Sequence, residues 1–179
     1  IIQWGEQKKY KDKVVYSEQT EYQKIVLTEW KDEHWLYLNG NLQFCSIDEK
    51  MYHEPLVHPI MQLHPKPQRI LILGGGDGCA VRELLKYSSV EKIDMVDLDP
   101  KMTDLGSNHP ILIDINKGSM QSKKLTINGA TENHIRVVFD PLDNGLLLCS
   151  RQLVNVDQMD QVALAAVFTL FALIEKLGT

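Results

Sequence analysis

One short stretch, residues 70–85, constrains the fold of this chain more than any other. An apolar run is interrupted by four glycines and Asp77 at residues 74–78, and apolar residues then resume at helical spacing. Glycine permits a tight turn and lets a ligand approach the backbone closely. The stretch therefore predicts a strand, a turn and a helix, with a ligand cradle at Gly74, Gly76, Asp77 and Gly78.

The acid inside this turn selects the kind of ligand. A carboxylate repels a phosphate but attracts an ammonium or sulfonium group, so Asp77 disfavours a pyrophosphate ligand. The glycine spacing also differs from the GxGxxG pattern of dinucleotide-binding loops. It is closer to the nucleoside-binding loop of enzymes that use S-adenosylmethionine.

A second apolar strand, predicted over residues 91–100, ends in Asp97 and Asp99 before a proline. In doubly wound sheets, an acid at the end of the second strand can accept hydrogen bonds from the two hydroxyls of a ribose. Asp97 is the first candidate for this contact and Asp99 the second. Together the two segments predict an α/β fold with a Rossmann-like, methyltransferase-like doubly wound sheet that binds a nucleoside.

The N-terminal part has a different pattern. Residues 14–47 alternate as in antiparallel strands, with a hairpin turn at Asn39-Gly40, and residues 48–63 have helical spacing. We expect a small antiparallel β module with a linking helix over residues 1–64, and a Rossmann-like catalytic domain over residues 65–179.

The pattern is less regular in the C-terminal half. Because Gly106, Pro110 and Gly118 punctuate residues 101–120, we expect no regular helix there. Short strands are predicted over residues 124–127, 135–139 and 146–149, and a closing helix over residues 162–177. The broken pattern around residues 104–134 would follow if loops were missing there, so we expect the second domain to be incomplete or gapped.

Composition excludes several classes of function. The 179 residues carry a formal net charge of −5, which argues against non-specific binding to nucleic acid. The three cysteines lie far apart, so neither disulfides nor a zinc site is expected. No apolar run reaches the length of about 18 residues typical of a membrane span. We expect a cytoplasmic protein with no membrane contact, and the edge strands of the β module predict a homodimer or homotetramer.

Several motifs, taken in order, resemble the polyamine aminopropyltransferases, the family of spermidine synthase. The motifs that carry the resemblance are Tyr22-Gln23, Leu38-Asn39-Gly40, Gln43, Asp48-Glu49, Tyr52-His53-Glu54, the glycine loop and Val96-Asp97-Leu98-Asp99. The resemblance covers about residues 10–102. It implies transfer of an aminopropyl group from the co-substrate decarboxylated S-adenosylmethionine to putrescine, giving spermidine and methylthioadenosine, without a metal or prosthetic group.

The same resemblance implies a set of site residues. The donor would be held by Gln23, Gly74, Gly76, Asp77, Gly78, Asp97, Asn128 and Gly129. The acceptor amine would be held by Tyr52, His53, Asp77 and Asp143, with Asp140 as the base that removes its proton. Two motifs depart from the family pattern: Asp140-Pro-Leu-Asp143 replaces Asp-x-x-Asp-Pro, and Asn128-Gly129 replaces Asp-Gly or Asp-Ala.

Other residues have simpler interpretations. Asp48 and Glu49 are interpreted as acids favoured by a helix dipole, His58 and His64 as surface or packing residues, and Cys79 as a small buried filler. Two alternative functions stay open. One is a methyltransferase that uses intact S-adenosylmethionine, although Asp77 and the presence of Ile72 two residues before Gly74 argue against it. The other is a nucleoside-binding homologue without catalytic activity.

Overall fold

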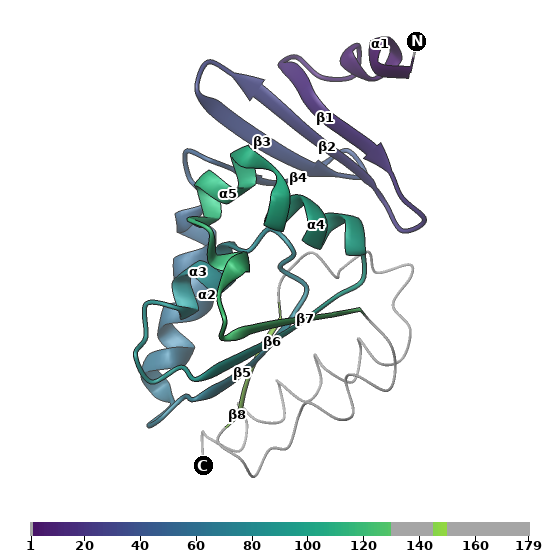
Figure 1. Cartoon of the computed structure of the whole chain (residues 1–179). Helices are drawn as coiled ribbons and strands as arrows, with labels where there is room; N and C mark the ends of the chain where they lie inside the picture. The colour runs from purple at the N-terminus through teal and green to yellow at the C-terminus, as the bar shows by residue number, and fades with distance from the viewer. Residues whose placement is uncertain (1, 130–144, 150–179) are drawn as a thin grey trace.

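The computed structural model describes residues 2–129 and 145–149, which form two sheets with helices between and beside them (Figure 1). A short helix, α1 (Ile2–Gln7), precedes a four-stranded antiparallel sheet in the order β1-β2-β3-β4. Its strands are β1 (Lys13–Gln19), β2 (Lys24–Trp30), β3 (Glu33–Leu38) and β4 (Asn41–Cys45). The predicted antiparallel β module is therefore confirmed.

The hairpin between β3 and β4 follows from its two turn residues. Asn39 and Gly40 both have positive φ angles, 51° and 79°, as a two-residue turn of the I′ type requires. On β2 and β3, Ile25, Leu27 and Leu36 are fully buried. They face the second half of the chain, where they form a core with residues of α4 and α5.

The second sheet is parallel and has the order β7-β6-β5-β8. Its strands are β5 (Arg69–Leu73), β6 (Lys92–Asp97), β7 (Leu125–Gly129) and β8 (Gly145–Cys149). Counted along the chain within this sheet, the order is third, second, first, fourth, so the direction of winding changes between β5 and β8. Ligands in doubly wound folds bind beyond the carboxyl ends of the strands near such a point. The predicted fold class is confirmed.

Helices α2 (Lys50–Leu63) and α3 (Cys79–Leu84) pack against each other beside the parallel sheet (Figure 1). Val57 and Met61 of α2 share one buried core with Ile70, Ile72 and Leu84. The helix that links the two halves thus packs into the core of the second one. The domain boundary after residue 64 stays a prediction.

Residues 100–121 differ from the sequence prediction, which expected no regular helix. They form α4 (Pro100–Asn108), α5 (Pro110–Asn116) and a 3-10 turn, η1 (Ser119–Gln121). The two prolines start the helices, at positions where a backbone N–H is not needed. Gly106 lies inside α4, at a position that requires a glycine because a Cβ there would be 2.1 Å from the carbonyl oxygen of Gly76. Residues that resembled helix breakers are therefore a helix start and a point of close packing.

The helices α4 and α5 lie between the two sheets (Figure 1), and Met102, Leu105 and Leu112 complete the core of the antiparallel sheet. In residues 2–129 and 145–149, no helix has both the length and the apolarity needed to cross a membrane. The predicted strand over residues 135–139 and the closing helix over residues 162–177 lie outside the described residues.

Candidate active site

The candidate site lies at the carboxyl ends of β5 and β6, where the glycine loop closes on the acid that ends β6. Gly74, Gly75 and Gly78 all have positive φ angles, between 81° and 84°. Gly76 is needed for close packing, since a Cβ there would lie 2.9 Å from Asp97 Oδ2. The loop and the strand-end acid therefore form one unit.

Asp97 is buried and tied to the backbone on both of its oxygens. Oδ2 accepts a hydrogen bond from the Gly76 N–H at 2.9 Å, and Oδ1 accepts one from the Asp99 N–H at 3.0 Å. Burial raises the pKa of Asp97 to about 6, although these two hydrogen bonds oppose the rise. Each oxygen of a carboxylate has two acceptor positions, so the fixed carboxylate still offers acceptors to a ligand.

Asp99 is engaged by the hairpin between β1 and β2. Its Oδ2 accepts hydrogen bonds from Thr20 Oγ1 at 2.8 Å and from Gln23 Nε2 at 3.0 Å. Its Oδ1 caps α4 by accepting from the Lys101 N–H at 3.0 Å. Because Asp99 already accepts three hydrogen bonds and Asp97 only two, Asp99 has fewer acceptor positions left for a ribose. Through its hydrogen bond to Asp99, Gln23 lies at the carboxyl end of β6 in the parallel sheet.

Asp77 lies at the start of α3 and is 1% exposed. Its Oδ1 accepts from the Cys79 N–H at 2.7 Å, and its main-chain carbonyl accepts from Asn116 Nδ2 at 2.8 Å. The same Asn116 amide nitrogen donates to the carbonyl of Gly106 at 2.8 Å. Asn116 thereby ties the glycine loop to α4. Nothing in the sequence near Asn116 indicates this role, which depends on the tertiary fold.

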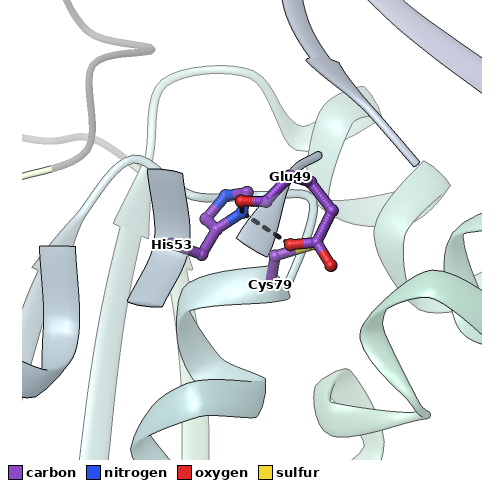
Figure 2. A group of neighbouring side chains, drawn as sticks. All are labelled: Glu49, His53 and Cys79. Carbon is purple, nitrogen blue, oxygen red and sulfur yellow. Dashed lines mark hydrogen bonds and ion pairs between the residues drawn. The ribbon is translucent and has the colours of Figure 1, made fainter. Parts of the chain in front are cut away.

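His53 connects α2 with the glycine loop. Its Nδ1 lies 2.9 Å from Glu49 Oε2, one helical turn earlier, and its Nε2 lies 3.8 Å from Asp77 Oδ1. Figure 2 shows the imidazole of His53 against the carboxylate of Glu49, with Cys79 beside them. Burial lowers the pKa of His53, but its hydrogen bond to Glu49 and the charges of Asp77 and Glu49 outweigh burial and raise it overall.

Glu49 forms a two-point ion pair with Arg82. Arg82 Nη1 donates to Oε1 at 2.8 Å and Nη2 donates to Oε2 at 2.9 Å. Burial raises the pKa of Glu49, but the hydrogen bonds of His53 and Arg82 dominate and hold it at about 2. The side chain makes no capping hydrogen bond at the start of α2. The interpretation of Glu49 as an acid favoured by the helix dipole therefore missed its ion pair with Arg82. In the sequence, only the spacing of four residues between Glu49 and His53 indicated a contact between those two side chains.

Two groups of side chains have the residue types of a metal site. Glu49, His53 and Cys79 each place one ligand atom within 4.8 Å of the others. Both oxygens of Glu49 are taken by Arg82, and burial raises the pKa of the Cys79 thiol well above its usual range. Because a metal needs a free carboxylate oxygen and a thiolate, this group does not fit one.

The second group is Glu54, His58 and Glu83. Glu83 is fully buried and already pairs with Arg82, Lys86 and His58, the last at 3.1 Å. The His58 Nδ1 atom is bonded to the Tyr87 hydroxyl at 2.8 Å, so His58 has partners that its sequence spacing did not indicate. This group is a charge network between α2 and α3, and a cation there would have to displace Lys86.

The remaining predicted site residues fall into two sets. Tyr52 is half-buried, and its ring lies edge-on to His53 at 5.0 Å between centroids. Asn128 and Gly129 end β7 and pair with Val96 and Asp97 in the sheet. They therefore share the edge that carries the glycine loop. Asp140 and Asp143 lie outside the described residues.

The parallel sheet with its glycine loop, its strand-end acid and the buried acid in the loop has the architecture of a doubly wound α/β protein. The sequence matches the spermine/spermidine synthase domain over residues 49–171. The chain therefore belongs to the spermine/spermidine synthase family.

Individual relatives agree with this. The chain is 50% identical over 127 residues to a polyamine aminopropyltransferase of Leptospira interrogans, covering 71% of this chain and 26% of that protein. It is 45% identical over 122 residues to one of Oceanobacillus iheyensis, covering 68% of this chain and 24% of that protein. The matched stretch thus spans about a quarter of the length of these curated relatives.

Solved structures give the same result. The crystal structure of spermidine synthase from Thermotoga maritima superposes with a TM-score of 0.68 at 32% identity, over 77% of this chain and 48% of that one. A spermidine synthase in complex with the transition-state analogue AdoDATO superposes with a TM-score of 0.61 at 36% identity, over 65% of this chain and 39% of that one.

Proposed function

We propose that this protein is a polyamine aminopropyltransferase that transfers the aminopropyl group of decarboxylated S-adenosylmethionine to putrescine, yielding spermidine and methylthioadenosine. One observation carries the proposal beyond family membership: the buried Asp77 inside the glycine loop, fixed by the Cys79 N–H. An intact methyl donor has its own carboxylate, which a buried acid at this point would repel. The decarboxylated donor has only an ammonium group on that arm, which the acid attracts.

Two acids divide the recognition of the donor in this proposal. Asp97 offers acceptors to the ribose hydroxyls, while Asp77 pairs with the ammonium of the aminopropyl arm. The reactive sulfonium then lies between these two anchors. We assign the adenine contact to Asn128 and Gly129, which end β7 beside Val96 and Asp97.

The reaction is a direct displacement. The lone pair of the putrescine amine attacks the carbon next to sulfur, so a C–N bond forms while the C–S bond breaks and its electrons go to sulfur. The amine attacks in its neutral form, and a base takes up its excess proton. Asp140 is the predicted base and Asp143 the predicted partner of the distal ammonium. Both lie outside the described residues and stay predictions.

This chain contributes mainly positioning. The sulfonium is already a good leaving group, so holding the amine and the carbon in line supplies much of the rate enhancement. We assign the acceptor contact to Tyr52 and His53, which is supported by the 3.8 Å between His53 Nε2 and Asp77 Oδ1 and by the ring contact of Tyr52 with His53. The proposed reaction requires no metal and no prosthetic group.

Product analysis tests the proposal. The purified chain is incubated with decarboxylated S-adenosylmethionine and putrescine, and the products are separated by chromatography. Spermidine and methylthioadenosine in equal amounts are expected. Formation of a methylated product from intact S-adenosylmethionine would identify a methyltransferase instead. Tight binding of the donor without turnover would identify a non-catalytic homologue.

The assembly and the compartment also remain proposals. We propose a homodimer or homotetramer in the cytoplasm, since β1 and β4 are the edge strands of the antiparallel sheet and exposed edges invite pairing. Light scattering of the purified protein measures the mass directly. A monomer at micromolar concentration would contradict this expectation.

A further inference from the structure

Asp99 is almost completely buried, yet it is not the acid that the donor is expected to touch. Its exposed fraction is 1%, and the hairpin residues Thr20 and Gln23 both donate to its Oδ2. Its Oδ1 is held by the Lys101 N–H at the start of α4. The carboxylate therefore joins the antiparallel module to the nucleoside edge of the parallel sheet.

This arrangement determines which way the Gln23 amide points. A carboxylate only accepts hydrogen bonds, so Gln23 must turn its NH₂ group toward Asp99. Thr20 likewise donates to Asp99 and does not accept from it, because its Oγ1 already accepts from the N–H groups of Tyr22 and Gln23, both at 3.0 Å. Within the described part of the chain, Gln23 Oε1 has no hydrogen-bond partner.

A chain of hydrogen bonds links the Gln23 amide to Asp97 through Asp99. The Asp99 N–H donates to Asp97 Oδ1 at 3.0 Å, and Asp97 Oδ2 accepts from Gly76. Gln23, Asp99 and Asp97 thus follow one another along the edge of the sheet. Gln23 Oε1 and the carboxylate of Asp97 remain as acceptors for a ligand at this edge.

We propose that Asp99 is a positioning residue that fixes the Gln23 amide with its oxygen toward the donor, so that Gln23 and Asp97 together present only acceptors to the two ribose hydroxyls. The inference rests on the proposed function in that it requires a ribonucleoside at this edge. Vicinal hydroxyls are two donors, and an acceptor-only surface matches them. An amide in the reverse orientation would present N–H groups to the same hydroxyls.

The substitution Asp99→Asn tests the inference because it should force the Gln23 amide to rotate. The Lys101 N–H still needs an acceptor, so the oxygen of Asn at position 99 caps α4 and its NH₂ group faces the hairpin. Gln23 must then turn its own oxygen toward position 99 and its NH₂ group toward the ligand. Asparagine is as good a helix cap as aspartate, so α4 keeps its start.

Calorimetric titration with methylthioadenosine at pH 8 measures the effect. Asp99→Asn is expected to weaken binding about five- to tenfold, as loss of one hydrogen bond does. The double variant Gln23→Glu with Asp99→Asn is expected to return to within about twofold of the wild type, because a carboxylate at position 23 accepts on both sides. Unchanged binding by Asp99→Asn, or a double variant no better than the single one, would overturn the inference.

Two further measurements separate positioning from folding. The first uses a methylthioadenosine analogue that lacks the ribose hydroxyl facing Gln23. For this analogue, the wild type and Asp99→Asn should bind with about equal affinity. A general structural defect would instead weaken Asp99→Asn by the same factor for every analogue. If Asp99→Asn fails to fold, Gln23→Met provides the test, because it removes the oxygen and leaves Asp99 in place. Gln23→Met should lose the same factor, and wild-type affinity would overturn the inference.

The outcome also distinguishes the inference from the proposed function. If the wild-type chain does not bind methylthioadenosine, the proposed function fails. If the wild type binds and the three variants bind equally well, only the role of Asp99 fails.

Discussion

His53 Nε2 lies 3.8 Å from Asp77 Oδ1, so the helix α2 reaches the glycine loop through one imidazole. The opposite nitrogen of this ring is held by Glu49, and Glu49 is held by Arg82. Four charged groups thus connect α2 with α3 behind the expected position of the donor's ammonium arm. Three of the predictions below concern members of this network.

The first prediction concerns the protonation of His53. Burial lowers its pKa, but Glu49 and Asp77 raise it overall above the usual 6.5. The substitution Glu49→Gln removes one charge and should lower the pKa of His53, as measured by NMR titration of the imidazole. In the wild type, the stability that His53 contributes is fully present below pH 6.5 and is lost as pH rises through the raised pKa. A higher pKa in Glu49→Gln would contradict this account.

Loss of Arg82 should destabilise the fold. In Arg82→Met the buried Glu49 loses its two-point partner, and an uncompensated buried charge costs about 3–5 kcal/mol in the free energy of unfolding. Urea denaturation measures this loss. The matched control is Lys117→Ala, which breaks an exposed pair with Asp114 and should cost less than about 1 kcal/mol. Equal losses in the two variants would show that the buried pair is unimportant.

Gly106→Ala should damage the site without touching a ligand. The added Cβ would lie 2.1 Å from the Gly76 carbonyl oxygen, so α4 or the glycine loop must move. Overpacking of this kind costs about 1–3 kcal/mol, and we expect weaker binding of methylthioadenosine as well. Gly5→Ala serves as the control, because its Cβ would meet nothing within 4 Å. Calorimetry and thermal melting of both variants decide the question.

Binding of the nucleoside should depend on pH through Asp97. Because burial raises the pKa of Asp97 to about 6, its carboxylate is mostly protonated at pH 5 and mostly ionised at pH 7. Affinity for methylthioadenosine should therefore rise about tenfold between these two values. In Asp97→Asn the affinity should be lower and the dependence near pH 6 should disappear. A pH profile shared by the wild type and the variant would assign the dependence to another group.

The sequence revealed those parts of the fold that are local. The hairpin at Asn39-Gly40 and the glycine loop are specified by the backbone needs of neighbouring residues, and Asp97 is found because it ends a strand. Gly106 and Pro110 were misread because a glycine or proline has the same appearance whether it breaks a helix, packs closely or starts a helix.

Contacts between distant residues were not accessible in this way. Arg82 and Glu49 are 33 residues apart, and Gln23 and Asp99 are 76 apart. The first pair meets because α2 packs against α3, and the second because the antiparallel sheet packs against α4 and α5. Side-chain type and spacing along the chain carry no signal for such pairs, and the same holds for Asn116.

Donor selection by Asp77 is the central claim, and titration calorimetry with the two forms of the donor tests it most directly. The wild type should bind decarboxylated S-adenosylmethionine at least about 100-fold more tightly than S-adenosylmethionine, since like charges at close range cost several kcal/mol. Asp77→Asn keeps an acceptor for the Cys79 N–H and should reduce this preference to below about tenfold. Tighter binding of intact S-adenosylmethionine by the wild type would contradict the account and indicate a methyltransferase.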